Sequence, residues 1–161
     1  MNTLERLERG EVTYFGEDTE SVAEALAADL PEDQALALHG EIGTGKTTFV
    51  KGLAKGWGIT DPVTSPTFNI FSVYTGRRTL IHLDAYRLDR ESQWENLLVE
   101  EFLNTPYCLV IEWPENVKSF LPANTWHIHF RQIALDIHLI QLKRDISGKE
   151  IKNESRTHNP H

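Results

Sequence analysis

The chain has 161 residues, of which 40% are apolar and 25% are charged, and its formal net charge at pH 7 is -8. This length suits one domain with its own core, and the acidic balance disfavours a broad basic surface for a nucleic-acid backbone. No apolar run approaches the ~20 residues of a membrane span. We therefore expect one soluble domain, in which any contact with RNA would run through a partner.

The amino end and the cysteine content indicate the cellular compartment. Residues 1–10 are rich in charge and lack the apolar segment of a secretory signal. Cys108 is the sole cysteine, so no intrachain disulfide can form, and its apolar neighbours predict a buried side chain. We expect a cytoplasmic protein.

Short β-like runs alternate with amphipathic helical patterns in the first third of the chain. In chain order, the expected elements are a strand at Val12–Phe15, a helix at Thr19–Leu30, a strand at Ala35–His39 and a helix at Lys46–Trp57. Asp18 is the expected N-cap of the first helix. This alternation predicts a layered α/β fold.

The middle and the end of the chain predict that the sheet is mixed. The expected elements are a hairpin of Asn69–Tyr74 with Thr79–Leu83, a helix within Glu91–Asn104, a strand at Tyr107–Ile111 and two strands at 126–131 and 135–139. The strand at Tyr107–Ile111 is apolar throughout, which is typical of a central parallel strand. The last two alternate, as half-buried antiparallel strands do, and we expect them to form one edge of the domain. Residues 1–146 are expected to form the domain, with 147–161 as a polar, flexible tail.

The loop between the second strand and its helix carries the most specific motif. Residues 40–47 fit the Walker A pattern G-x-x-x-x-G-K-[ST] in the strand-loop-helix context that it requires. Its glycines let successive N–H groups face phosphate oxygens, and the positive end of the helix adds attraction. Lys46 is expected to reach the β- and γ-phosphates, and the Thr47 hydroxyl to bind Mg²⁺. The expected nucleotide-binding residues are Gly40, Glu41, Ile42, Gly43, Thr44, Gly45, Lys46, Thr47, Thr48 and Trp113.

Two carboxylates follow the predicted strands next to this loop. Glu112 ends an apolar strand in the manner of a Walker B acid, and Asp84 ends the strand at Thr79–Leu83. In α/β folds such positions lie at the edge where ligands bind, so both are expected to serve Mg²⁺ or to orient the attacking water. The catalytic set is therefore Lys46, Asp84 and Glu112, and the metal set is Thr47, Asp84 and Glu112. Which carboxylate acts as the base stays open.

Three further features have two interpretations each. A turn-forming segment could be a switch that responds to the γ-phosphate or a plain connection, and it comprises Thr64, Ser65, Pro66, Thr67 and Phe68. Trp113 could cover the site or simply pack against the strand end. His127 and His129 share a strand face, but without a nearby cysteine or carboxylate set they are expected to be surface residues rather than metal ligands.

Together these segments resemble the TsaE (YjeE) family of bacterial ATPases, which are needed for the threonylcarbamoyladenosine (t6A) modification of tRNA. Besides the Walker A loop, the resemblance depends on Thr64-Ser65-Pro66-Thr67-Phe68, His82-Leu83-Asp84-Ala85-Tyr86-Arg87 and Ile111-Glu112-Trp113-Pro114-Glu115, and it spans about 12–142. It implies a three-layer P-loop NTPase fold with a parallel core and antiparallel edge strands. It also implies ATP and Mg²⁺ as cofactors, and ATP hydrolysis that sustains turnover of a TsaB–TsaD pair.

The resemblance also implies roles for individual residues. Lys46 and Thr47 would serve phosphate and Mg²⁺, Asp84 and Glu112 would serve metal and hydrolysis, and 64–68 would be the switch segment. The chemistry on adenosine would belong to TsaD, so that tRNA is contacted only through the complex.

The residues also bear on three other functions. A GTPase would need N-K-x-D and D-x-x-G motifs, and neither 116–119 nor 84–87 supplies them. A small-molecule kinase would need a lid and an acceptor pocket, for which the chain shows no segment. A nucleotide-dependent regulatory module with little hydrolysis of its own remains compatible with the sequence.

Overall fold

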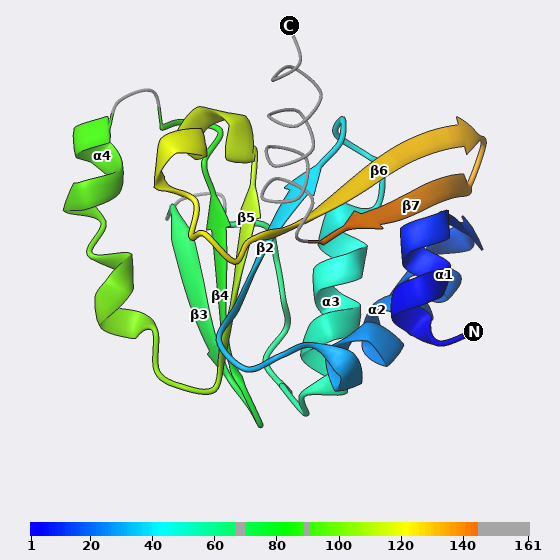
Figure 1. The fold of residues 1–161 in the computed structure, drawn as a ribbon, viewed down its shortest axis with the longest axis horizontal. Coiled ribbons are helices and arrows are strands. Elements are labelled where there is room, and N and C mark those ends of the chain that lie inside the picture. Colours follow the sequence, from blue (N-terminus) through cyan, green and yellow to red (C-terminus); the bar gives the residue numbers. More distant parts are fainter. Residues whose placement is uncertain (67–69, 89–90, 145–161) are drawn as a thin grey trace, which may run out of the picture.

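The computed structural model describes residues 1–66, 70–88 and 91–144. Within these ranges one sheet runs in the order β1-β7-β6-β2-β5-β4-β3 (Figure 1). Its strands are β1 (Glu11–Tyr14), β2 (Gln34–His39), β3 (Phe71–Thr75), β4 (Thr79–Asp84), β5 (Tyr107–Glu112), β6 (Trp126–Ala134) and β7 (Ile137–Lys143). The helices are α1 (Thr3–Arg9), α2 (Phe15–Asp29), α3 (Lys46–Gly56), α4 (Glu91–Asn96) and the 3₁₀ segments η1 (Val99–Phe102) and η2 (Pro114–Phe120).

The middle of the sheet is parallel and its flanks are antiparallel. β2 pairs in parallel with β5 and β6, and β4 pairs in parallel with β5. β3 pairs antiparallel with β4, β7 with β6, and β1 with β7. The mixed sheet, the hairpin and the central position of β5 are therefore confirmed. The expectation that the last two strands form the edge was wrong, because β1 pairs with β7 and lies outside it.

Helices cover both faces of the sheet, which confirms the three-layer architecture (Figure 1). One core contains α2 and α3 residues with Leu36 and Leu38 of β2. The other contains Ala35 of the same strand with Trp94 of α4 and Val117 of η2. Neighbouring residues of β2 thus enter opposite cores, as the two-residue period of a strand requires.

The helix that follows the Walker A loop packs unusually close to α2. A Cβ atom on Gly52 would lie 2.3 Å from the Glu20 carbonyl oxygen and 2.6 Å from the Ala23 Cβ. One turn later, a Cβ on Gly56 would lie 2.6 Å from the Ala27 Cβ. Small residues on both helices therefore set the position of α3 and of the loop that precedes it.

Some local predictions were wrong for identifiable reasons. α1 was not predicted, yet Asn2 caps it by accepting a hydrogen bond from the Glu5 N–H (2.9 Å), and Leu7 is buried. α2 begins at Phe15, so Asp18 is not its N-cap; its carboxylate instead accepts from the Tyr14 N–H (2.9 Å). The helix expected within 91–104 is broken at Leu98, whose φ is 55°.

One further prediction concerns residues beyond those described. The tail at 147–161 lies outside the described residues, so the division of the chain at residue 146 stays a prediction. None of the described helices is long and apolar enough to cross a membrane.

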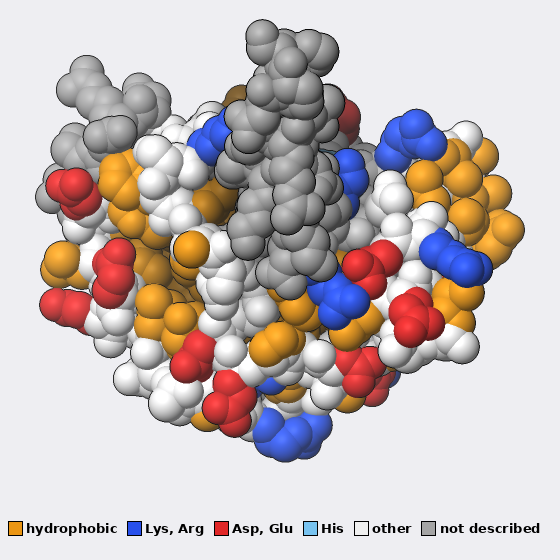
Figure 2. Space-filling view, viewed as in Figure 1, with side chains coloured by type: hydrophobic (Ala, Val, Ile, Leu, Met, Phe, Trp, Pro, Cys, Tyr) orange, Lys and Arg blue, Asp and Glu red, His pale blue; other side chains and the backbone are white. Residues whose placement is uncertain are grey.

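In Figure 2, acidic side chains are dispersed over the visible face, whereas apolar side chains gather at the outer end of the β6–β7 hairpin, where Ile133 and Leu135 are exposed.

Candidate functional site

The Walker A loop has the conformation that its glycines make possible. Gly40 has a φ of 153°, and a Cβ there would lie 2.8 Å from both the Phe130 carbonyl oxygen and the Thr44 Oγ1. Gly45 is left-handed, with a φ of 98°, and immediately precedes α3. The Thr44 hydroxyl donates to the Glu41 carbonyl (2.7 Å) and closes the loop on itself. A side chain at Gly40 would force β2 and β6 apart.

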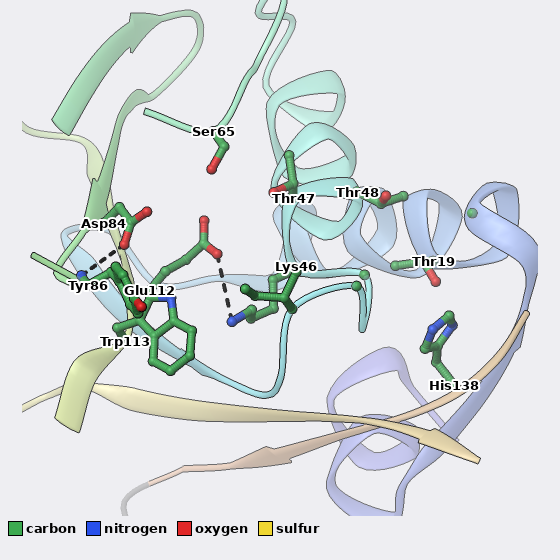
Figure 3. Close-up of a pocket in the computed structure, with 14 residues that line it drawn as sticks. Thr19, Lys46, Thr47, Thr48, Ser65, Asp84, Tyr86, Glu112, Trp113 and His138 are labelled. Atoms are coloured by element: carbon green, nitrogen blue, oxygen red, sulfur yellow. Dashed lines mark hydrogen bonds and ion pairs between the residues drawn. The ribbon is translucent and has the colours of Figure 1, made fainter. Parts of the chain in front are cut away.

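A cavity of about 520 Å³ opens beside this loop. Of the residues predicted to bind nucleotide, it is lined by Ile42, Gly43, Gly45, Lys46, Thr47, Thr48 and Trp113. Gly40, Glu41 and Thr44 are not on its wall. Both predicted carboxylates, Asp84 and Glu112, line the same cavity, and Figure 3 shows them facing the loop from the strand ends.

Lys46 is folded back into the loop rather than extended into solvent. Its side chain is only 6% exposed, and its ammonium donates to the Gly40 carbonyl at 2.6 Å. The same Nζ lies 4.0 Å from the Glu112 Oε1 and 4.8 Å from the centre of the Trp113 ring. A buried cation is thus held at the cavity wall by a carbonyl, a carboxylate and an aromatic face.

Glu112 is held by a buried histidine that motif reasoning did not assign a role. The His82 Nε2 lies 2.5 Å from the Glu112 Oε2, and His82 is fully buried. The His82 Nδ1 has no hydrogen-bond partner among the described residues. The tautomer with a proton on Nε2 satisfies this arrangement, because the bare Nδ1 then leaves no donor unpaired. His82 therefore orients Glu112, with Oε1 toward Lys46.

Strand register explains why these acidic groups meet. Asp84 and Glu112 are direct partners in the parallel pairing of β4 with β5. His82 lies two residues before Asp84 and so shares its face of β4. That period of two was the signal in the sequence that could have identified His82. Asp84 is half-buried, and its Oδ1 accepts from the Tyr86 N–H at 2.9 Å.

Trp113 forms a wall of the cavity. Its φ of 56° is left-handed, which is rare for so large a residue, and its ring centre lies 5.1 Å from that of Tyr86. Tyr86, which also lines the cavity, is 61% exposed. The indole lies against Lys46 and also packs on one of the two hydrophobic cores, so both interpretations of Trp113 stay open.

The predicted switch segment is described only in part. Ser65 lines the cavity, and the Thr64 N–H donates to the Tyr74 hydroxyl at 3.4 Å. Residues 64–66 have no regular secondary structure. Thr67 and Phe68 lie outside the described residues, so both the switch role and the alternative of a plain connection stay open.

The cavity also contains residues that no motif indicated. Gly16 and Thr19 of α2 and His138 of β7 line it. Figure 3 shows Thr19 and His138 at the side away from Asp84 and Glu112. The Thr19 hydroxyl pairs with that of Thr13 at 2.9 Å. Both ring nitrogens of His138 are buried and have no partner among the described residues. These residues come together only because β1 pairs with β7.

A second group of histidines adjoins the start of the loop. The His39 Nε2 lies 2.8 Å from the His127 Nδ1, and the His39 ring stacks on that of His129 with centres 4.4 Å apart. Burial, followed by the charges of His129, His127 and Lys46, lowers the pKa of His39 to about 4. Burial also lowers the pKa values of His127 and His129. The three rings are therefore a neutral, half-buried cluster at pH 7, more tightly packed than the expected surface residues.

Three features together define the P-loop NTPase class of fold. They are the carboxyl ends of a parallel sheet, a glycine-rich loop that enters a helix, and a buried lysine beside two strand-end carboxylates. Comparison with known proteins narrows the class. The family model described as threonylcarbamoyl adenosine biosynthesis protein TsaE matches residues 15–139. The chain therefore belongs to the TsaE family.

Individual relatives agree with this assignment. The tRNA threonylcarbamoyladenosine biosynthesis protein TsaE of Treponema pallidum is 40% identical over 123 residues, which cover 76% of this chain and 91% of that protein. The protein of the same description from Bacillus subtilis is 37% identical over 125 residues, or 77% and 78% of the two chains. A crystal structure of YdiB from Bacillus subtilis superposes with a TM-score of 0.70 at 31% identity, covering 94% of this chain and 95% of that one.

Proposed function

We propose that this protein is a Mg²⁺-dependent ATPase that supports the formation of t6A in tRNA together with a TsaB–TsaD pair in the cytoplasm. The observation that carries the proposal is the meeting of Lys46, Asp84 and Glu112 at one cavity beside the Walker A loop. Membership of the TsaE family supplies the link to t6A biosynthesis. The acidic net charge of -8 favours contact with tRNA through the partners rather than directly.

The Walker A loop offers several groups that would bind a triphosphate. Residues 43 and 45–48, which belong to the loop and the first turn of α3, line the cavity, and their main-chain N–H groups and the helix N-terminus would attract phosphate oxygens there. The Lys46 ammonium, now bonded to the Gly40 carbonyl, lies within reach of the terminal phosphates. A phosphate oxygen would replace that carbonyl as its partner and strengthen the bond, because both groups would then be charged.

The oxygen donors around the cavity fit Mg²⁺. Hard carboxylate and hydroxyl oxygens are its preferred protein ligands, and Thr47, Asp84 and Glu112 supply them from three elements. Bound Mg²⁺ supplies neutralisation of the negative charge on the β- and γ-phosphates. Thr47, Asp84 and Glu112 would hold it, directly or through water.

The two carboxylates differ in a way that separates their roles. Glu112 is 5% exposed, and the hydrogen bond from His82 and the nearby Lys46 both stabilise its negative charge. A buried carboxylate held in one orientation in this way is suited to be a fixed metal ligand. Asp84 is half-buried and accepts one main-chain hydrogen bond from Tyr86. We therefore assign the metal primarily to Glu112 and the orientation of the attacking water to Asp84.

Phosphate release tests the proposal directly. The purified chain is incubated with ATP and Mg²⁺, alone and with TsaB and TsaD, and inorganic phosphate is measured. We expect slow release by the chain alone and faster release in the complex. ATP binding without release in either mixture would favour a regulatory binding module, and phosphate transfer to a small acceptor would favour a kinase.

Two lysines of α3 provide a matched pair of variants for nucleotide binding. Lys46→Ala removes the buried cation, and we expect ATP affinity to fall by about 10- to 100-fold, the usual loss for a charged hydrogen bond. Lys51→Ala removes an exposed lysine from the same helix and is expected to leave affinity unchanged. Equal ATP affinity for the two variants, measured by titration calorimetry, would contradict the proposed site.

A further inference from the structure

His82 is a polar residue at a position that an apolar side chain would ordinarily fill. It lies within β4 between Ile81 and Leu83, and all three side chains are fully buried. Burial of an imidazole is unfavourable unless its polar atoms are paired, whereas an apolar side chain at the same place would add to the core. The proposed hydrolysis assigns His82 no step, so its burial needs a reason of its own.

Among the residues that the structure describes, the His82 ring has one hydrogen-bond partner, the Glu112 carboxylate. Its Nε2 lies 2.5 Å from the Glu112 Oε2, and its Nδ1 has no partner in the same part of the chain. Hydrogen bonds to a charged acceptor are roughly twice as strong as those between neutral groups. The histidine thus uses its hydrogen-bonding capacity on one oxygen of a proposed metal ligand.

The strand register shows what this bond does to the two carboxylates. Asp84 and Glu112 are direct partners in the pairing of β4 with β5, where like charges repel each other. His82 stands two residues before Asp84, opposite Val110, and so reaches Glu112 from the interior side. Asp84 accepts its hydrogen bond from the Tyr86 N–H instead, at 2.9 Å. The two acids are therefore held by different partners, on different sides.

The other oxygen of Glu112 stays on the cavity side. Its Oε1 lies 4.0 Å from the Lys46 Nζ, which is longer than the roughly 2.7–2.9 Å of a direct charged hydrogen bond. Figure 3 shows the Glu112 side chain reaching from the strand end toward Lys46. Without the bond from His82, Glu112 would be free to close on the ammonium and to withdraw both groups from a ligand.

We propose that His82 is a positioning residue of the metal site, which holds Oε2 of Glu112 and so presents Oε1 to Mg²⁺. The inference rests on the proposed function. A residue that hydrogen-bonds to a metal ligand orients that ligand, and its loss typically weakens metal binding by about 10- to 100-fold. In this role His82 touches neither nucleotide nor metal and acts through Glu112 alone.

The gain in ATP affinity that Mg²⁺ brings isolates this role. The full chain is titrated calorimetrically with ATP, once with excess Mg²⁺ and once with EDTA, and the ratio of the two affinities is the gain. A general distortion of the loop lowers both affinities and leaves the ratio unchanged. In His82→Leu, which removes both ring nitrogens, we expect the gain to fall by about tenfold or more. An unchanged gain would overturn the inference.

Two further variants test whether the hydrogen bond is the cause. His82→Gln keeps an amide N–H that can donate to Glu112, and its gain is expected to stay within about threefold of the wild type. In a Glu112→Gln background, His82→Leu is expected to change the gain by less than about twofold, because the residue through which His82 acts is already altered. Equal losses in His82→Leu and His82→Gln, or the same loss in both backgrounds, would contradict the positioning role.

A measurement on the unmodified protein covers the case in which the variants do not fold. In a long-range ¹H–¹⁵N NMR spectrum of the histidine side chains, His82 is expected to carry its proton on Nε2. This nitrogen is expected to shift when Mg²⁺ is added to the ATP complex, because its partner carboxylate then shares its charge with the metal. A proton on Nδ1 instead, or no response to Mg²⁺, would overturn the inference.

The titrations also separate this inference from the proposed function. If Mg²⁺ does not raise the ATP affinity of the wild type, the proposed metal site fails and the positioning role with it. If Mg²⁺ raises the affinity equally in the wild type and in His82→Leu, the metal site stands and only the inference fails. A gain that depends on His82 supports both.

Discussion

Acid is expected to destabilise the fold through His39, the residue just before the Walker A loop. Burial and the charges of neighbouring groups lower its pKa from 6.5 to about 4. Above pH 6.5 the His39 ring is neutral in both the folded and the unfolded chain, so it contributes nothing to the pH dependence of the free energy of unfolding. Between pH 6.5 and 4 the unfolded chain binds a proton that the folded chain does not, so the free energy of unfolding falls as the pH falls.

The size of the effect follows from the pKa difference. A difference of about 2.5 units at 1.36 kcal/mol per unit is about 3 kcal/mol, and screening of a half-buried group reduces it to about 2 kcal/mol. His127 and His129, whose pKa values are also lowered by burial, act in the same direction. The loss of stability begins near pH 6.5 and is complete only below pH 4.

Urea unfolding at several pH values between 7.5 and 4.5, monitored by tryptophan fluorescence, measures this dependence. Because carboxylates titrate near pH 4 as well, the informative quantity is the difference between the wild type and His39→Asn, which keeps hydrogen-bonding groups but does not titrate. We expect the wild type to lose about 1 to 2 kcal/mol more than the variant over this range. A difference that stays constant with pH would refute the reasoning.

Two other substitutions test the site and its support. Glu112→Gln is expected to retain ATP binding and to lower phosphate release by about tenfold or more, because a charge at the proposed metal site is lost while the shape is kept. The exposed Glu101→Gln is its control, and unaltered release would assign the metal-binding role to Asp84 instead of Glu112. Gly52→Ala is expected to cost about 1 to 3 kcal/mol in urea unfolding, because its Cβ would lie 2.3 Å from the Glu20 carbonyl oxygen. Lys51→Ala is expected to stay within about 0.5 kcal/mol, and a stabilised Gly52→Ala would show that helix propensity outweighs packing.

The parts of the site that could be predicted are those that depend on local sequence. The Walker A loop is encoded by consecutive residues, and its position between β2 and α3 was recognisable from one apolar strand and one amphipathic helix. Asp84 and Glu112 were predicted as a pair because the carboxyl ends of parallel strands share an edge of the sheet. The observed register, in which these two residues are direct partners, agrees with that reasoning.

The parts that were missed depend on which strands become neighbours. β1 and β7 lie at opposite ends of the described chain, and nothing in either strand indicates that they pair. Their pairing displaces β6 and β7 from the edge and brings Thr13, Thr19 and His138 together. His82 was missed for a different reason, since a lone histidine in a strand has no motif until its cross-strand partner is known.

The charges around the cavity give a physical reason for the proposed dependence on Mg²⁺. Lys46 contributes one positive charge, and it is already shared with the Gly40 carbonyl and Glu112. Asp84 and Glu112 contribute two negative charges on the same wall. A triphosphate without a metal ion would thus be repelled at its γ-phosphate end. The N-terminus of α3 offsets this repulsion only in part, because its effect is that of about half a positive charge. Mg²⁺ held by Asp84 and Glu112 would supply the positive charge that offsets this repulsion, so the acids that would repel ATP alone would become the groups that hold its metal complex.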